Sequence, residues 1–275
     1  MPISSVTREL LIKKRLFTVL SDQVKDSEFY DQNLYDKLIA YADAYIVHHK
    51  LTPKEVSKSY LSFIKEYNKD ARLFDETGQY PLELDADRGE PSRTAYSIIL
   101  LLSTLLTFHR LRIMQLIQNK TELGEAGLFI GCGPGLEIDL VRSKFTKLVA
   151  YDLTLDPFLR GYYFDSVDFR NAYFEGNGKE KYSHIYLIEL LEHLADPYEI
   201  LINCKKVLDE KGQLFLTTAT NIPQFDHLYN FPADHMEFDE KLMEMGYSIL
   251  YSEDIVHDYM TKSIGSANKF YILTH

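Results

Sequence analysis

Tryptophan is absent from the 275-residue sequence, and cysteine occurs only twice, as Cys132 and Cys204. Neither cysteine belongs to a CxxC pair or to a Cys/His cluster with zinc-finger spacing, which argues against a structural zinc site. The first residues, Met1 to Ser5, contain no basic stretch followed by an apolar one, so no secretory leader is expected there. With so little cysteine, the sequence predicts a cytoplasmic protein in a reducing compartment.

Basic residues are outnumbered, because 30 lysines and arginines stand against 41 acidic residues and give a formal charge of −11. This balance argues against binding by broad neutralisation of nucleic-acid phosphates, so a nucleic-acid partner is not expected. Long apolar runs are also missing. The longest, Ile98 to Phe108, is interrupted by two threonines and a serine and is much shorter than the roughly 20 residues of a membrane span. It predicts a buried helix and no membrane partner.

The charge and the hydrophobic pattern both change near residue 121. Residues 1–120 carry 17 basic and 16 acidic groups, whereas residues 121–275 carry 13 and 25. We therefore predict a helical N-terminal region over 1–120 and a second domain over 121–275. A capping box at Thr52, followed by proline and completed by Glu55, predicts one helix start. The remaining helices are predicted over Val6–Leu20, Phe29–His48 and Ser92–Lys120, with Ser92 as N-cap and a loop over Phe74–Pro91.

Beyond residue 126, short apolar runs of strand length alternate with amphipathic segments. This alternation predicts an α/β fold with a doubly wound, mainly parallel sheet. In such sheets a ligand binds at the carboxyl ends of the strands, where the strand order reverses. The predicted strands are Leu128–Ile130, Lys147–Tyr151, His184–Ile188, Gln213–Thr217 and Phe270–Leu273.

A glycine-rich turn, GCGPG, follows the first predicted strand, with glycine at positions 131, 133 and 135. Glycine there permits a sharp turn and lets a ligand approach the main chain. The dinucleotide fingerprint GxGxxG would require glycine where this sequence has Leu136. Glycine turns after strands also occur without any ligand.

Asp152 ends the second predicted strand, 21 residues after Gly131. A carboxylate at that point can accept hydrogen bonds from both hydroxyls of a ribose. The alternative is a solvated aspartate at a strand end. The glycine turn at the appropriate distance favours the ribose interpretation.

Two further segments, ELLEHLADP over 189–197 and VLDEKGQL over 207–214, complete an ordered set of motifs. With the glycine turn and Asp152, they resemble the class I S-adenosylmethionine-dependent methyltransferases over about residues 125–275. The resemblance implies a Rossmann-like, seven-stranded, mostly parallel sheet with residues 1–120 as a helical cap, and S-adenosylmethionine as cofactor. It implies cofactor contacts for Gly131, Cys132, Gly133, Gly135, Asp152, Leu153, Asn171, Ala172 and Glu189.

The sequence departs from the family pattern at two positions. Phe129 stands where many members have an acidic residue that anchors the methionine amino group, and His184 stands where many have aspartate. Asn171 and Ala172 stand where an Asp-Ala pair commonly meets the adenine edge, and an asparagine carbonyl can still accept from the adenine amino group.

The segment that begins at Glu189 also has the pattern ExxEH. If a helical turn begins there, Glu189, Glu192 and His193 lie on one face. Small-RNA 2′-O-methyltransferases and some ubiquinone-pathway O-methyltransferases hold a divalent metal with a similar motif. The resemblance implies a Mg²⁺ or Mn²⁺ site of Glu189, Glu192, His193 and His235, with Glu192 and His193 catalytic. The alternatives are metal-free base catalysis by His193, or by His227, and a purely structural role.

These inferences predict an enzyme that methylates a small-molecule acceptor, with O-methylation favoured over N- or C-methylation. Two alternatives stay open: ribose 2′-O-methylation of RNA, and a non-catalytic S-adenosylmethionine-binding partner subunit. The helical cap is expected to close over the cleft, to form a homodimer, or only to shield the sheet. Its candidate pocket residues are Arg93, Tyr96 and His109.

Overall fold

A computed structural model describes residues 5–78, 91–224, 226–231, 236–257 and 266–275. In this part of the chain, seven strands form one sheet in the order β3-β2-β1-β4-β5-β7-β6. All neighbouring pairs are parallel except those that β7 makes with β5 and β6. The predicted doubly wound α/β fold with a mostly parallel seven-stranded sheet is therefore confirmed. The strands are β1 (Gly124–Ile130), β2 (Phe145–Asp152), β3 (Asp168–Asn171), β4 (Tyr182–Leu187), β5 (Leu208–Thr220), β6 (Ser248–Val256) and β7 (Ala267–Thr274).

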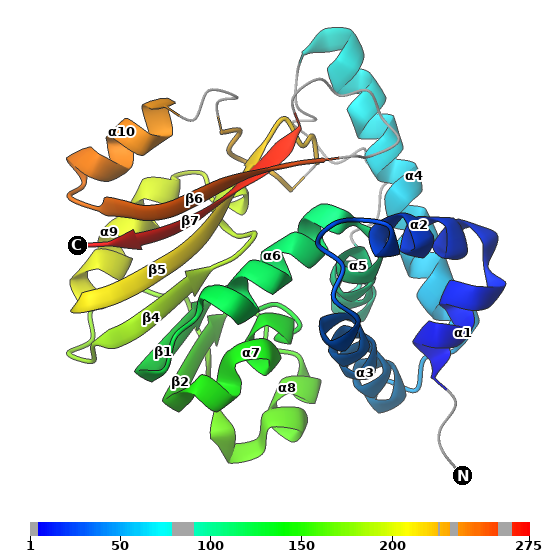
Figure 1. Cartoon of the computed structure of the whole chain (residues 1–275), viewed down its shortest axis with the longest axis horizontal. Coiled ribbons are helices and arrows are strands. Elements are labelled where there is room, and N and C mark those ends of the chain that lie inside the picture. The colour runs from blue at the N-terminus through cyan, green and yellow to red at the C-terminus, as the bar shows by residue number, and fades with distance from the viewer. Residues whose placement is uncertain (1–4, 79–90, 225, 232–235, 258–265) are drawn as a thin grey trace.

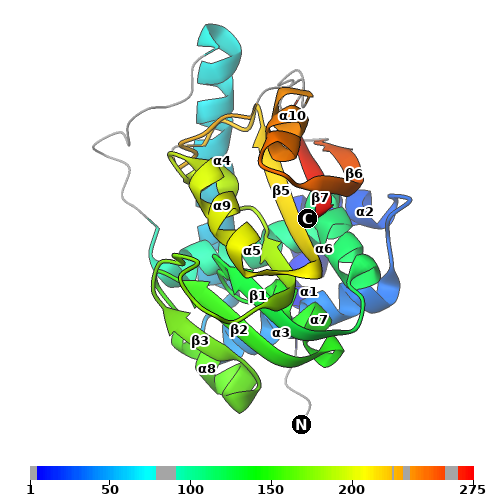
Figure 2. The same cartoon turned by 90° about the vertical axis from the view of Figure 1, so that its left-hand side faces the viewer.

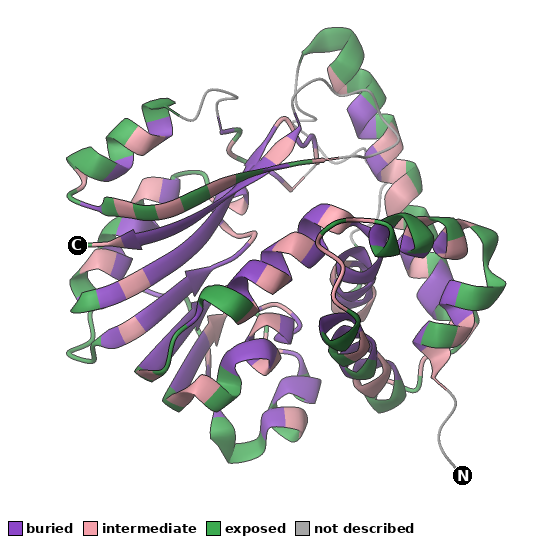
Figure 3. Cartoon of the chain, in the orientation of Figure 1, coloured by how far each residue is buried: buried purple, intermediate pink, exposed green. Residues whose placement is uncertain are grey.

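All five predicted strands are present, and the two that the sequence did not predict have little continuous apolar character. β3 has only four residues, three of them polar. β6 lies at the edge of the sheet, so exposed and partly buried side chains alternate along it, whereas the central strands are buried along most of their length (Figure 3). An edge strand with one solvated face carries a weaker hydrophobic signal than a central one.

Within residues 5–78 and 91–120, six helices precede the sheet, and their boundaries correct two predictions. The capping box at Thr52 and the N-cap at Ser92 are confirmed, but a single helix over 6–20 is wrong because the chain is extended at Lys14. Residues 79–90 of the predicted loop lie outside the described residues, and α4 continues to Thr77. The helices are α1 (Val6–Lys13), α2 (Arg15–Lys25), α3 (Gln32–His48), α4 (Pro53–Thr77), α5 (Arg93–Leu106) and α6 (Phe108–Lys120).

A single helix over 92–120 is also wrong, because the chain bends by 87° between α5 and α6. Thr107 has extended backbone angles there, with φ −134° and ψ 132°. Its hydroxyl donates to the Ser103 carbonyl at 2.8 Å, and its N–H donates to the same oxygen at 2.9 Å, which closes the last turn of α5. Within the described residues, no single helix is long and apolar enough to cross a membrane, and α5 with α6 passes that test only as this bent pair.

Helices cover both faces of the sheet (Figures 1 and 2). The sheet has two hydrophobic cores, and successive side chains of β1 belong alternately to one and the other. Leu128 and Ile130 pack with α9 and α10, whereas Phe129 packs with the N-terminal helices. The helical cap thus shares one hydrophobic core with the sheet. The helices that follow β1 are α7 (Leu136–Val141), α8 (Pro157–Tyr163), α9 (Pro197–Val207) and α10 (Met236–Glu244).

Helix α3 attaches the cap to the loops at the carboxyl ends of β1 and β2. The Tyr41 hydroxyl donates to the carbonyl of Pro134, inside the glycine turn, at 2.6 Å. Asp156, which is 2% exposed, accepts from the Tyr45 hydroxyl at 2.5 Å and lies 2.9 Å from Nε2 of His49. The same carboxylate caps α8 by accepting from the Phe158 N–H. Three groups therefore depend on one buried carboxylate.

Substitution of Asp156 by alanine is expected to lower the free energy of unfolding by about 3 kcal/mol, because it leaves a buried hydroxyl and a helix N–H without their acceptor. Urea unfolding followed by circular dichroism measures the change. Asp165→Ala, at an exposed position in the 3₁₀ turn that follows α8, is the control and should change stability by less than about 0.5 kcal/mol. Equal effects of the two substitutions would contradict the proposed attachment of the cap.

Candidate active site

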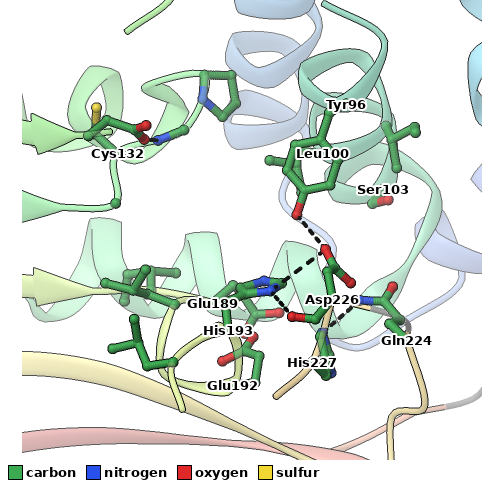
Figure 4. Close-up of a pocket in the computed structure, with 18 of the residues that line it drawn as sticks. Tyr96, Leu100, Ser103, Cys132, Glu189, Glu192, His193, Gln224, Asp226 and His227 are labelled. Carbon is green, nitrogen blue, oxygen red and sulfur yellow. Dashed lines mark hydrogen bonds and ion pairs between the residues drawn. The ribbon is translucent and has the colours of Figure 1, made fainter. Parts of the chain in front are cut away.

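A cavity of about 400 Å³ lies at the carboxyl ends of the parallel strands, where the strand order reverses between β1 and β4. The glycine turn borders it on one side and α5 borders it on the other (Figure 4). Residues of α4 also line it. The segments after β4 and β5 complete the lining. The cavity is thus in the place that the sheet topology predicts for a ligand.

The glycine turn has the backbone conformation for which glycine is needed. Gly131 has φ +68° and Gly135 has φ +80°. A Cβ at Gly131 would lie 2.7 Å from the Leu190 side chain, and one at Gly135 would lie 2.6 Å from Leu159. The N–H groups of Gly131 and Cys132 both donate to the Tyr151 carbonyl, which ties the turn to β2. Cys132 is itself buried and lines the cavity.

Asp152 lies beside this turn and holds it in place. Its Oδ2 accepts from the Gly133 N–H at 2.9 Å, and its Oδ1 accepts from the Thr154 N–H at 2.9 Å. A third group comes from the cap, since Nη2 of Arg93 lies 3.2 Å from Oδ1. The carboxylate lines the cavity, as the ribose interpretation requires.

The other residues that the resemblance assigns to the cofactor divide into two groups. Leu153, Ala172 and Glu189 line the cavity. Asn171 does not belong to the cavity lining. Its side-chain amide donates to the Leu153 carbonyl, and its side-chain carbonyl accepts from the Leu155 N–H. Asn171 therefore shapes the loop after β2 in this structure.

Glu189 does not share a helical face with Glu192 and His193, so this expectation is wrong. Glu189 has φ +50°, and only residues 191–193 form a turn of 3₁₀ helix. The side chain points to other partners: Oε2 lies 3.0 Å from Nη1 of Arg110, and Oε1 accepts from Asn268 at 2.7 Å. Both oxygens of Glu189 are thus engaged away from His193.

Arg110, on α6, is a site residue that the sequence analysis missed. Its side chain is buried, and it lies between Glu189 and Glu137, whose carboxylate is 3.9 Å away. Burial acts to lower the pKa of Arg110, but the two carboxylates outweigh it and raise the pKa. The signal in the sequence was an arginine within the apolar stretch FHRLRIMQLI, where a buried cation needs a partner.

His193 forms the centre of a chain of polar groups that links the sheet to the cap (Figure 4). Its Nδ1 lies 2.9 Å from the carbonyl oxygen of Asp226 and 3.6 Å from Oδ2 of the same residue. The Tyr96 hydroxyl, on α5, donates to that carboxylate at 3.4 Å. Burial lowers the pKa of His193, but the charges of Glu192 and Asp226 outweigh burial, so the pKa is raised.

Three possible metal donors lie together, but they are not the four that the sequence suggested. Donor atoms of Glu192, His193 and His227 lie within 4.8 Å of one another. Burial, with the charge of Glu189, raises the pKa of Glu192 to about 8. Its Oε2 is buried and has no hydrogen-bond partner among the described residues. Glu189 is engaged elsewhere, and His235 lies outside the described residues.

The helical cap supplies several of the residues that line the cavity. Arg93, Tyr96 and His109, the candidate pocket residues of the cap, all line the cavity. Apolar and aromatic side chains form part of the cap side of the cavity: Phe63, Tyr67, Tyr96, Ile99 and Leu100. Ile222, which follows β5, adds another apolar side chain to the lining.

Comparisons with known proteins agree with this geometry. A family model described as a methyltransferase domain matches residues 107–261, more than half of the chain. The ubiquinone biosynthesis O-methyltransferase of Actinobacillus pleuropneumoniae serotype 7 (strain AP76) is 29% identical over 116 residues, which cover 37% of this chain and 50% of the relative. That of Xanthomonas euvesicatoria pv. vesicatoria (strain 85-10) is 31% identical over 126 residues, which cover 42% and 53%. The chain spans about half the length of these curated relatives.

A solved structure supports the fold. A chain in the complex between the Haloferax volcanii Trm112 methyltransferase activator and a methyltransferase superposes with a TM-score of 0.52 at 14% identity. The match covers 68% of this chain and 100% of that one. The sheet order, the glycine turn at the switch point and the matched family model lead to one conclusion: the chain belongs to the class I S-adenosylmethionine-dependent methyltransferases.

Proposed function

We propose that the chain transfers a methyl group from S-adenosylmethionine to a hydroxyl oxygen of a small, largely apolar molecule, with His193 as the base. The His193–Asp226 pair at the cavity carries this proposal. If Nδ1 donates to the Asp226 carbonyl at 2.9 Å, Nε2 is the nitrogen left to accept a proton. A hydroxyl must lose its proton as it attacks, whereas an unprotonated amine needs little such help.

The character of the cavity supports a small, largely apolar acceptor. Aromatic and aliphatic side chains of the cap, among them Phe63, Tyr96 and Leu100, line the cavity beside its charged groups and can bury apolar surface of an acceptor. The curated relatives are named for O-methylation in ubiquinone biosynthesis, which supports an oxygen acceptor. The net charge of −11 disfavours RNA, the alternative acceptor.

The cofactor fits the polar end of the cavity. We propose that Asp152 holds the ribose hydroxyls and that the guanidinium of Arg110 holds the methionine carboxylate. Nε of Arg110 is buried without a hydrogen-bond partner among the described residues, so it has a donor to offer. Glu137 and Glu189 flank the same guanidinium and can take the methionine ammonium, which compensates for Phe129 where many relatives have an acid.

The protein then has three tasks in the reaction. The cofactor supplies a sulfonium methyl, which is already a strong electrophile. The cap and the glycine turn hold the acceptor in line with it and exclude water. His193 takes the proton of the hydroxyl, and the Asp226 carboxylate, 3.6 Å from Nδ1, stabilises the imidazolium that results.

One observation favours a metal-assisted form of the same reaction. Oε2 of Glu192 has no hydrogen-bond partner among the described residues, and ring nitrogens of His193 and His227 lie near it. Together they offer a mixed oxygen and nitrogen donor set that suits a divalent cation. These three residues would hold the ion. When bound, it would lower the pKa of an acceptor hydroxyl and so take the place of His193 as base, because a histidine nitrogen bound to the ion cannot also accept a proton.

The test is transfer of labelled methyl from S-adenosylmethionine to a panel of apolar phenols and catechols, in EDTA and with Mg²⁺ or Mn²⁺ restored. We expect O-methylated products by mass spectrometry. Transfer that persists in EDTA would support His193 as sole base, and transfer that requires the ion would support the metal-assisted form. Exclusive N- or C-methylation of matched amines or carbon acids, or transfer to an RNA 3′ end, would contradict the proposal.

A further inference from the structure

We propose that Arg93 occupies part of the ribose site until the cofactor displaces it, so that the cofactor binds before the acceptor and releases a cationic recognition group for it. This inference rests on the proposed position of the ribose at Asp152. The evidence is the ion pair that joins the first residue of α5 to the end of β2.

The hydrogen-bonding capacity of Asp152 leaves too little room for both Arg93 and a ribose. A carboxylate has about four lone-pair sites, two on each oxygen. Oδ2 accepts from the Gly133 N–H, and Oδ1 accepts from the Thr154 N–H and faces Nη2 of Arg93 at 3.2 Å. One site is free on Oδ2, and the second site on Oδ1 is covered by Nη2 of Arg93, which lies against it without forming a hydrogen bond. A ribose diol brings two donors, so one group already at Asp152 must leave.

Arg93 is the group that can leave at the lowest cost. The N–H groups of Gly133 and Thr154 belong to backbone turns that form the cofactor site itself. Arg93 is a flexible side chain, 31% exposed, and its Nε and Nη2 make no hydrogen bond within the described residues. Among the described residues, the ion pair with Asp152 is the one that the structure records for its guanidinium. Ribose hydroxyls, which make two hydrogen bonds to the carboxylate, replace it.

Once released, the guanidinium belongs to the acceptor part of the cavity. Arg93 lies three residues before Tyr96 on α5, so the two side chains share a helix face, and both line the cavity. Tyr96 already contacts Asp226, the partner of His193. A freed Arg93 therefore presents N–H donors on the side where the acceptor binds. The group that suits them is an oxygen acceptor, a carbonyl or a carboxylate, on the molecule that is methylated.

Titration of S-adenosylhomocysteine into the full chain tests the displacement without any acceptor. This ligand has the ribose but lacks the sulfonium charge, so the loss of a cation at Arg93 alters its long-range electrostatics little. We expect Arg93→Met to bind it about fivefold more tightly than the unmodified protein, since a partly exposed ion pair no longer competes. Arg93→Lys, which keeps the charge, should bind within about twofold of the unmodified protein. Arg8→Met, which removes a surface pair with Asp36, is the control and should change nothing.

Equal or weaker binding by Arg93→Met would overturn the inference. Hydrogen exchange of the unmodified protein gives a second measurement that does not depend on the variant folding. We expect amides at the start of α5, over 93–97, to exchange faster after S-adenosylhomocysteine is added, and slower exchange there would overturn the displacement. Asp152→Asn tests the position of the ribose separately from the displacement of Arg93. If this variant binds S-adenosylhomocysteine with unchanged affinity, the ribose does not bind at Asp152, and the inference loses its basis.

Discussion

Replacement of His193 by glutamine is expected to lower the single-turnover rate of methyl transfer by about 10²- to 10⁴-fold, the usual contribution of a positioned general base. Glutamine keeps the size and polarity of the side chain but cannot accept the proton at neutral pH. The affinity for S-adenosylhomocysteine should stay within about threefold, because this ligand presents no hydroxyl to the base. Rapid-quench measurement of labelled product, with the apolar phenol that gives the best turnover, determines the rate.

Two companion variants make the result specific. His48→Gln, on the exposed end of α3, is the matched control and should leave the rate unchanged. Asp226→Asn should lower the rate by about tenfold, because it removes the charge that stabilises the imidazolium but leaves the backbone carbonyl that orients the ring at 2.9 Å. A His193→Gln enzyme that retains full rate would show that another group, such as the Glu192 carboxylate, removes the proton.

The sequence predicted the parts of the site that follow from continuous local patterns. The apolar runs placed β1 and β2, and their boundaries placed the glycine turn and Asp152 at the same edge of the sheet. Thr52 and Ser92 were recognisable because an N-cap is a local motif in which one side chain accepts from a backbone N–H three residues later. None of these inferences needed a contact between distant segments.

The parts that could not be predicted depend on contacts distant in sequence. The bend at Thr107 lies within a run whose composition is helical on both sides, and it separates α5, which packs against α3 and α4, from α6, which packs against α7 and β6. Glu189 matched a metal-binding motif by spacing. Its orientation is set instead by Arg110, 79 residues earlier, and by Asn268, 79 residues later. Spacing along the chain carries no information about either partner.

The same contacts show why the cap is part of the cofactor site and not only a cover over the acceptor. Tyr41 of α3 and Tyr163 of α8 donate to consecutive carbonyls of the glycine turn, at 2.6 Å each, and their hydroxyls lie 3.2 Å apart. Arg93 of α5 reaches Asp152, and Arg110 of α6 reaches Glu189. The glycine turn, Asp152 and Glu189 thus each have a partner from residues 1–120. Because of this coupling, we expect changes in the cap to alter cofactor affinity as well as acceptor choice.

Arg110 provides the strongest test of that coupling, because Arg110→Met is expected to weaken S-adenosylhomocysteine binding by about 100-fold. Truncation of one partner of a buried charge pair usually costs 2–5 kcal/mol, roughly 30- to several-thousand-fold in affinity when the pair contacts the ligand. The variant loses the donor for the methionine carboxylate and leaves Glu137 and Glu189 without their cation. Calorimetric titration, at a temperature where circular dichroism shows the variant folded, measures the affinity.

Arg112→Met is the matched control for that experiment. Arg112 lies two residues further along α6 and pairs through two nitrogens with Glu253 of β6, at 2.7 and 2.8 Å, and it is not part of the cavity lining. Its loss should lower the free energy of unfolding by about 1 kcal/mol without changing the affinity for S-adenosylhomocysteine. If both variants weaken binding equally, the effect comes from general destabilisation of α6. If Arg110→Met binds within threefold of the unmodified protein, the methionine carboxylate lies elsewhere, and Arg110 serves only to neutralise two buried glutamates.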